Sequence, residues 1–166
     1  RTMLGIAAPR VGLLSNGTED HKGAELQHET FPLLKAADAA GRIRFIGNVE
    51  ASQVFNGDVD VVVTDGFTGN IILKTSEGMG KFFSNELKSM VKSFPGMLGA
   101  PFLAGKLRAL KKKSDSNEAG GAPLLGLRKP VIKAHGSSDA YAIKNAIRQA
   151  NQFASSGIIG NISDNI

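Results

Sequence analysis

Apolar residues in the first part of the chain fall into short runs that polar turns separate. Residues 11–15, 43–46 and 59–64 form three such runs, and the last contains consecutive valines, which favour extended backbone. Between the first two runs, residues 23–40 follow a helical pattern that Gly41 ends. The side chains expected on one side of this helix are Leu26, Phe31, Leu34 and Ala37. Strands that alternate with helices predict a parallel sheet in an α/β fold.

A longer helical stripe follows, from about residue 70 to residue 93. Its apolar positions recur at steps of three and four, and they are Met79, Phe83, Leu87, Met90 and Phe94. Pro95 and Gly96 end this helix, and a second helical stretch follows Pro101. We therefore expect residues 79–113 to form a protruding helical hairpin with an apolar tip, followed by a flexible loop at 114–121.

The last part of the chain predicts a small hairpin and a final helix. Residues 124–127 and 131–133 read as two short strands, and residues 138–155 as the helix. The expected buried face of this helix consists of Ile143, Ile147, Ala150 and Ala154. No internal repeat is visible, so we treat residues 1–166 as a single part of an α/β protein.

The composition of the chain limits the kinds of binding site and catalytic group that it can contain. The chain has 166 residues and no cysteine, which excludes disulfides, thiolate metal sites and a thiol nucleophile. The three histidines have no metal-ligand spacing, so we expect no metal site. A net charge of +5 favours anionic partners, but aromatic residues are too scarce for a single-strand nucleic-acid groove. No signal peptide is visible, so we expect a cytoplasmic protein.

Three glycine-rich polar turns each follow a strand and precede a helix, at residues 16–23, 65–70 and 135–139. Ligands of open α/β sheets bind beyond the carboxyl ends of the strands, where backbone N–H groups and helix N-termini attract anions. The turns therefore favour an anionic ligand. The alternative is that glycine and asparagine merely permit a positive φ angle there.

The last turn also contains His135, Ser137 and Asp139, the residue types of a nucleophilic triad. Residues so close along the chain rarely align a nucleophile, a base and an orienting carboxylate. We prefer the interpretation that Ser137 or Ser138 caps the final helix and that Asp139 interacts favourably with its N-terminal dipole.

Five blocks of the sequence together resemble one known family. They are GTEDHKG at 17–23, FIGNVE at 45–50, DGFTGN at 65–70 followed by KTSEG at 74–78, GGAPLLG at 120–126, and KAHGSSDA at 133–140 with KNAIR at 144–148. In order and approximate spacing, these blocks look like the C-terminal half of the PlsX family of phosphate acyltransferases. We therefore expect the chain to be part of a longer protein.

The resemblance implies an enzyme that moves a fatty acyl group from acyl-(acyl carrier protein) to inorganic phosphate, giving acyl phosphate for phospholipid synthesis. It also implies a homodimer, no cofactor, and a layered α/β fold like that of isocitrate and isopropylmalate dehydrogenases. Two alternatives stay open: a non-catalytic module that binds carrier protein or membrane, and an oxidoreductase on the same superfold. The oxidoreductase would need a dinucleotide fingerprint or a cluster of metal-binding carboxylates, and the sequence contains neither.

On this basis we assign roles as hypotheses. Lys22 neutralises phosphate, while Asn70 and the N–H groups of Thr68 and Gly69 hold phosphate or the developing oxyanion. His135 protonates the departing thiolate or binds phosphate. Asp65 orients Lys22 or His135. The remaining phosphate-binding candidates in the three turns are Gly17, Thr18, Glu19, Gly66, Ser137 and Ser138.

Residues 93–105 carry no charge and precede a basic stretch. The segment is too short to span a bilayer, but it suits a tip that enters a membrane interface. The side chains expected to face lipid are Phe94, Met97, Leu98, Phe102 and Leu103. A dimer contact or a core position is the alternative. A further hypothesis is that the acidic carrier protein meets the basic residues Arg128, Lys129, Lys144 and Arg148.

Overall fold

The computed structural model describes residues 5–93, 102, 105, 106, 109, 118 and 120–164. The chain divides into two compact units, the first ending at Met79 and the second beginning at Gly80. Each unit is described by itself.

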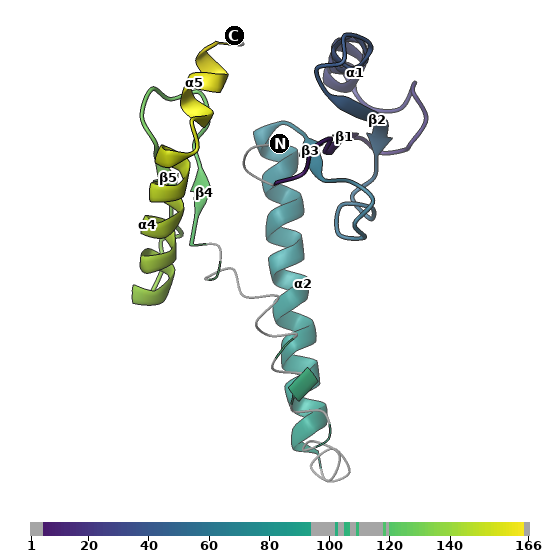
Figure 1. Cartoon of the computed structure of the whole chain (residues 1–166). Coiled ribbons are helices and arrows are strands. Elements are labelled where there is room, and N and C mark those ends of the chain that lie inside the picture. The colour runs from purple at the N-terminus through teal and green to yellow at the C-terminus, as the bar shows by residue number, and fades with distance from the viewer. Residues whose placement is uncertain are drawn as a thin grey trace. The chain divides into compact units, whose positions relative to one another are not determined.

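The first unit contains a three-stranded parallel sheet (Figure 1). Its strands are β1 (Arg10–Leu14), β2 (Arg44–Val49) and β3 (Val61–Val63), in the order β2-β1-β3. Helix α1 (Glu25–Ala39) links β1 to β2, and Gly41 follows it in the left-handed region at φ +68°. These elements confirm the predicted α/β fold with a parallel sheet.

The core of this unit lies around the central strand. Its buried apolar residues are Val11, Leu13, Leu14, Val49 and Val59. Gly12 lies against β2 so closely that a Cβ atom would be 2.6 Å from Val49 Cγ1. Helix α1 covers the sheet through Phe31, whose ring meets that of Phe45 edge-on with centroids 5.2 Å apart.

Strand β2 contains an irregularity that changes the side-chain alternation. Val11 aligns with Phe45, but Leu13 aligns with Asn48, so β2 carries one residue more than β1 between these pairs. Gly47 accommodates the bulge with φ +91°. As a result, the consecutive residues Asn48 and Val49 are both buried.

An ion pair joins β1 to the segment before β3 at the amino end of the sheet. Arg10 Nε and Nη2 each donate to the Asp60 carboxylate at 2.9 Å, and the Arg10 backbone N–H donates at 2.8 Å. These hydrogen bonds lower the pKa of Asp60 to about 2, from 3.8.

Helix α2 (Gly66–Lys92) begins four residues before its predicted start. The reason is Asp65, whose Oδ1 accepts the N–H groups of Phe67 and Thr68 and so caps the helix. The apolar side chains of the predicted stripe on α2 are all exposed, namely Met79, Phe83, Leu87 and Met90. Phe94 lies outside the described residues, as do most of the predicted second hairpin helix and most of the loop at 114–121.

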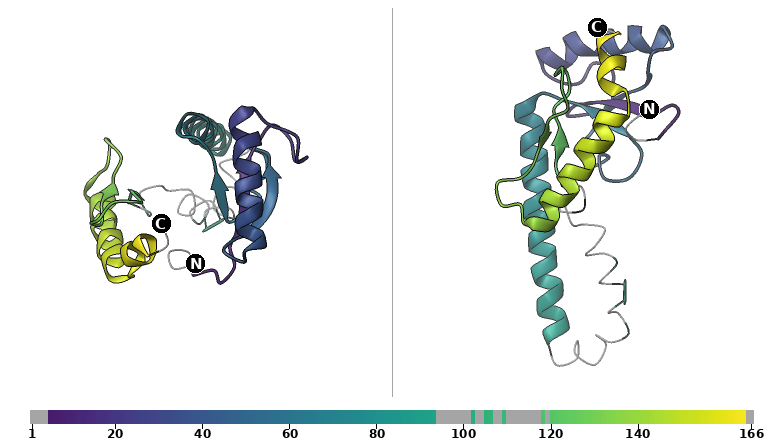
Figure 2. Two further views of the ribbon diagram at one scale, coloured as in Figure 1. Left: turned by 90° about the horizontal axis from the view of Figure 1, so that it is seen from above. Right: turned by 60° about the vertical axis from the view of Figure 1, so that its left-hand side comes forward.

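The second unit contains a small hairpin and two helices, and the hairpin lies beside the longer helix (Figure 2). Strands β4 (Ala122–Pro123) and β5 (Ile132–Lys133) are antiparallel, and helices α4 (Ala140–Ser155) and α5 (Ile158–Ser163) follow. The predicted strand at 124–127 is wrong, because β4 ends at Pro123. Only Leu124 extends the pairing, through a 2.9 Å hydrogen bond from its N–H to Val131 O.

The face of α4 that is buried differs from the predicted one. The buried residues are Ala142, Asn145, Ala146 and Phe153, whereas Ile143, Ile147 and Ala154 are exposed, Ile147 by 66%. The helical period is correct, but the buried face is shifted by one residue. The shift follows from Gly120, which approaches the helix so closely that a Cβ atom would lie 2.3 Å from Ala146 N. Small side chains on α4 make room for that approach.

Candidate functional site

The sheet brings two of the three glycine-rich turns to one edge. Strands β1 and β3 are parallel neighbours, so their carboxyl ends meet. The turn at 16–23 follows β1, and the turn at 65–70 follows β3 and opens α2. Lys22 and Asn70 therefore both belong to the carboxyl edge, where ligands of parallel α/β sheets bind.

In the turn at 16–23, glycine makes room for the lysine stem. Gly17 is buried, and a Cβ atom on it would lie 2.8 Å from Lys22 Cγ and 2.8 Å from Glu19 Oε2. The N–H of Lys22 donates to Glu19 O at 3.0 Å. Lys22 is half-buried, and it forms no ion pair within the described part of the chain. Thr18 and Glu19 are exposed beside it. Its ammonium group is thus uncommitted.

Contacts from α1 and β2 brace this turn. Asp20 pairs with Lys35 of α1 at 3.5 Å, and His28 Nε2 lies 3.0 Å from His21 O. Asn48 of β2 donates from Nδ2 to Glu19 O at 2.7 Å. The sequence interpretation assigned no role to Asn48; the available signal was a polar amide within an apolar strand.

The turn at 65–70 uses its backbone donors internally. Thr68 N–H donates to Asp65 Oδ1 at 2.8 Å, and Gly69 N–H donates to Asp65 O at 3.0 Å. The Thr68 side chain and the backbone N–H groups of Thr68 and Phe67 lower the pKa of Asp65. The expectation that the two N–H groups are free for an anion is therefore corrected. The Asp65 carboxylate caps α2, whereas it was expected to orient Lys22 or His135. Asn70, the fifth residue of α2, is exposed, as is Gly66, the first.

The turn at 135–139 belongs to the second unit and fixes the ring of His135. Ser137 N–H donates to His135 Nδ1 at 3.2 Å, and Ser137 Oγ lies 2.8 Å from the same atom. A backbone N–H can only donate, so Nδ1 accepts and the neutral ring carries its proton on Nε2. His135 is exposed. This geometry supports His135 as a donor through Nε2.

Asp139, rather than either serine, is the N-cap of α4. Its Oδ1 accepts the N–H of Ala142 at 2.8 Å. The prediction that Ser137 or Ser138 caps the helix is therefore wrong. Ser138 is half-buried, and its N–H donates to His135 O at 3.0 Å. Because Asp139 caps the helix, the three residues do not form a triad.

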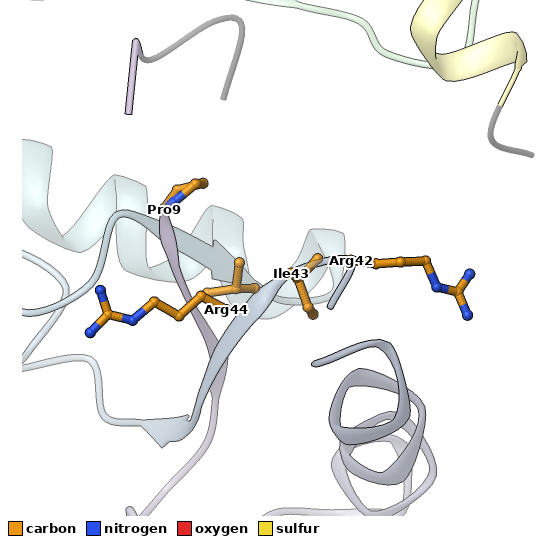
Figure 3. Close-up of a pocket in the computed structure, with 5 residues that line it drawn as sticks. Pro9, Arg42, Ile43 and Arg44 are labelled. Carbon is orange, nitrogen blue, oxygen red and sulfur yellow. The ribbon is translucent and has the colours of Figure 1, made fainter. Parts of the chain in front are cut away.

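A shallow hollow elsewhere on the sheet contains none of the predicted site residues. It lies at the amino ends of β1 and β2 and is lined by Pro9, Val11, Arg42, Ile43 and Arg44. Figure 3 shows the two arginine side chains extending away from each other, so they do not converge on one ligand. Across the described ranges, no three His, Asp or Glu side chains lie close enough to hold a metal ion.

The structure thus gathers part of the predicted site. The turns that carry Lys22 and Asn70 share an edge of the first unit, while His135, Ser137 and Ser138 lie in the second unit. Of the five predicted tip residues, Phe94, Met97, Leu98 and Leu103 lie outside the described residues. Phe102 is described and is 88% exposed. No helix within the described segments is both long and apolar enough to cross a membrane.

These features define an α/β protein with an uncommitted lysine at the carboxyl edge of a parallel sheet. The sequence model described as "Fatty acid synthesis protein" matches residues 1–161, so the chain belongs to that family, the PlsX family.

Among curated proteins, the chain is 51% identical over 165 residues to a phosphate acyltransferase of Helicobacter hepaticus. It is 49% identical over 167 residues to one of Clostridium perfringens and 48% identical over 165 residues to one of Bacillus licheniformis. The alignments cover 99%, 100% and 99% of this chain, but 48%, 48% and 49% of the relatives. The chain therefore spans about half the length of the curated relatives it matches.

Proposed function

We propose that the full-length protein carrying this sequence transfers a fatty acyl group from acyl-(acyl carrier protein) to inorganic phosphate. Family membership and the shared name of the relatives support the reaction. The observation that carries its location is the half-buried, uncommitted Lys22 at the carboxyl edge of the sheet. A lysine in this position favours an anionic substrate.

The reaction needs little activation of the nucleophile, because phosphate is already anionic near neutral pH. A phosphate oxygen attacks the thioester carbonyl carbon, and the tetrahedral intermediate expels the carrier thiolate as the C–S bond breaks. Lys22 balances the charge of phosphate, and the Asn70 side-chain amide donates to the developing oxyanion. The proton on His135 Nε2 serves the departing thiolate or the phosphate. The phosphate-binding candidates that complete this proposal are Gly17, Thr18, Glu19, Gly66, Ser137 and Ser138.

The finer features of the family extend this proposal. We infer a layered dehydrogenase-like fold and a homodimer. The exposed apolar stripe of α2 supports the homodimer, because a large exposed apolar surface is typical of a protein–protein contact. We also infer a cytoplasmic enzyme that contacts the membrane through the tip. The exposure of Phe102, the tip residue that the structure describes, supports this contact, since 88% of its surface is accessible. Carrier-protein docking on the basic residues 128, 129, 144 and 148 belongs to the same proposal.

The direct test measures acyl-phosphate formation by the full-length enzyme and its Lys22→Ala and Asn70→Ala variants. We expect each substitution to lower kcat/KM for phosphate by about a hundredfold, the usual effect of removing one preorganised charge or donor. The matched control is Lys74→Ala, an exposed lysine paired with Glu77 on α2. Near-normal rates in both site variants would overturn the site assignment.

A separate assay tests the membrane contact. Leu98→Glu places a charge among the apolar residues of the proposed tip. We expect this variant to lose co-flotation with anionic liposomes while it retains acyl-phosphate formation in solution. Unchanged flotation would overturn the tip and leave the transfer reaction unaffected.

A further inference from the structure

The side chain of Asn48 ties β2 to the turn that carries Lys22. Asn48 is the penultimate residue of β2 and is only 5% exposed. Its Nδ2 donates to Glu19 O at 2.7 Å and lies 3.4 Å from Lys22 O. One amide group therefore contacts the carbonyls at both ends of the 19–22 turn, across 29 and 26 residues of chain.

The same turn is closed from within by the bond between Lys22 N–H and Glu19 O. Glu19 O thus accepts two donors, and the Lys22 backbone is held on both its N–H and its C=O side. Beyond the backbone, the lysine stem lies against Gly17. The point from which the Lys22 side chain extends is therefore fixed by the position of this turn.

The oxygen atom of the Asn48 amide has no comparable hydrogen bond among the described residues. Asn48 Oδ1 is buried and accepts no hydrogen bond from any residue that the structure describes. A buried acceptor without a donor destabilises the fold. An apolar residue would avoid this penalty at a position in the sheet, so packing alone does not account for an asparagine here.

Backbone geometry aims the amide at the turn. The extra residue in β2 falls between Phe45 and Asn48, and Gly47 adopts φ +91° within it. Bulges of this kind redirect the side chain that follows them. A Cβ atom on Gly47 would meet nothing within 4 Å, so the left-handed backbone, rather than a lack of space, requires glycine.

We propose that Asn48 is a positioning residue for the phosphate site: through the carbonyls of Glu19 and Lys22, its amide holds Lys22 where phosphate binds. The proposal rests on the proposed function for its substrate. Asn48 does not touch the reacting atoms, and its effect passes through Lys22.

The test compares Asn48→Leu with wild type in the full-length enzyme. Leucine has the same number and branching of side-chain heavy atoms, although it is larger, and it removes both the clamp and the unpaired Oδ1, so we expect the fold to be retained. We expect KM for phosphate to rise about tenfold, because a displacement of about 1 Å in a positioned group has effects of this order or larger. KM for the acyl-carrier substrate should stay unchanged. A merely structural role would instead lower the active fraction and leave both KM values unchanged, which would overturn the proposal.

Gly47→Ala provides a second route to the same displacement. It strains the bulge without touching Asn48, and we expect it to raise KM for phosphate as well. Gly41→Ala is the matched control, since Gly41 has φ +68° and equally open surroundings but lies after α1. An equal rise in both glycine variants would contradict a specific effect of the bulge.

Two further measurements separate this inference from the proposed function. In a double variant with Lys22→Ala, Asn48→Leu should add no further rise in KM for phosphate, because both act on one group; additive effects would overturn the proposal. Amide exchange reads the clamp without catalysis: the Lys22 N–H should exchange at least about tenfold faster in Asn48→Leu, and unchanged exchange overturns the clamp. If Lys22→Ala leaves KM for phosphate unchanged, the assignment of Lys22 to the phosphate site fails, and amide exchange still decides whether the clamp exists.

Discussion

Two glycine-rich segments, 17–23 and 120–126, differ in what lies beside their first glycine. A Cβ atom on Gly17 would meet the side chains of Lys22 and Glu19, whereas one on Gly120 would meet the backbone of α4 at Ala146 N. Side chains can move aside and a helix backbone cannot. The first segment thus combines its glycine with an uncommitted lysine, while in the second the glycine serves close packing. Two segments of similar composition therefore differ in role: the first positions a candidate substrate-binding lysine, and the second allows close packing against α4.

The largest effect expected from this contrast is on stability. Gly120→Ala brings a Cβ atom 2.3 Å from Ala146 N and forces alanine into φ +79°. Overpacking and left-handed strain together should lower the free energy of unfolding by about 3 kcal/mol. Denaturant unfolding of the full-length protein measures the loss.

Gly126→Ala is the matched control for that substitution. Gly126 has φ +80° with nothing within 4 Å of its Cβ position, so only the strain of about 1 kcal/mol remains. Equal losses at the two positions would remove the packing role of Gly120.

Gly17→Ala should act on catalysis instead. The new methyl group displaces the Lys22 stem, which lies 2.8 Å from the Cβ position, and the flexible side chains absorb the contact. We expect KM for phosphate to rise about tenfold while the melting temperature changes little. Steady-state kinetics with phosphate as the varied substrate checks this. A large loss of stability with unchanged KM would make Gly17 architectural too.

The cap of α4 provides a smaller stability effect. Asp139→Ala removes the acceptor for Ala142 N–H and should cost about 1 kcal/mol. Asp139→Asn keeps an acceptor oxygen and should retain most of the stability. If both variants retain near-normal rates of acyl-phosphate formation, Asp139 serves only as a helix cap. A specific loss of rate in both variants would instead indicate a catalytic role for Asp139.

The smallest effect concerns the amino end of the sheet and depends on pH. Hydrogen bonds from Arg10 depress the pKa of Asp60 to about 2, below its ordinary 3.8. A depressed carboxylate stabilises the fold above the ordinary pKa and loses this contribution as pH falls towards the depressed value. The stability advantage of wild type over Asp60→Asn should therefore be full above pH 3.8 and shrink towards about pH 2. An advantage independent of pH would contradict the role of the charge.

Periodicity predicted the existence and type of most elements, because buried strands and helices leave repeating apolar patterns. It did not predict the bulge at Gly47, since strand register depends on the neighbouring strand. It also placed the buried face of α4 one residue off, because the close approach of Gly120 decides that face. At the site, the turns and Lys22 were visible in the sequence. The capping by Asp65 and the clamp by Asn48 were not, because they depend on contacts that only the folded chain makes.

The proposed mechanism depends above all on phosphate binding at the carboxyl edge of the sheet. The NMR signals of glycine and lysine backbone amides report directly where the anion binds. The full-length protein, labelled with ¹⁵N in glycine and lysine, is titrated with inorganic phosphate. We predict shifts of the Gly17 and Lys22 signals in wild type, and loss of the Gly17 shift in Lys22→Ala. Shifts at Gly41 and Gly57, near the arginines of the amino end, with none at the carboxyl edge would contradict the account.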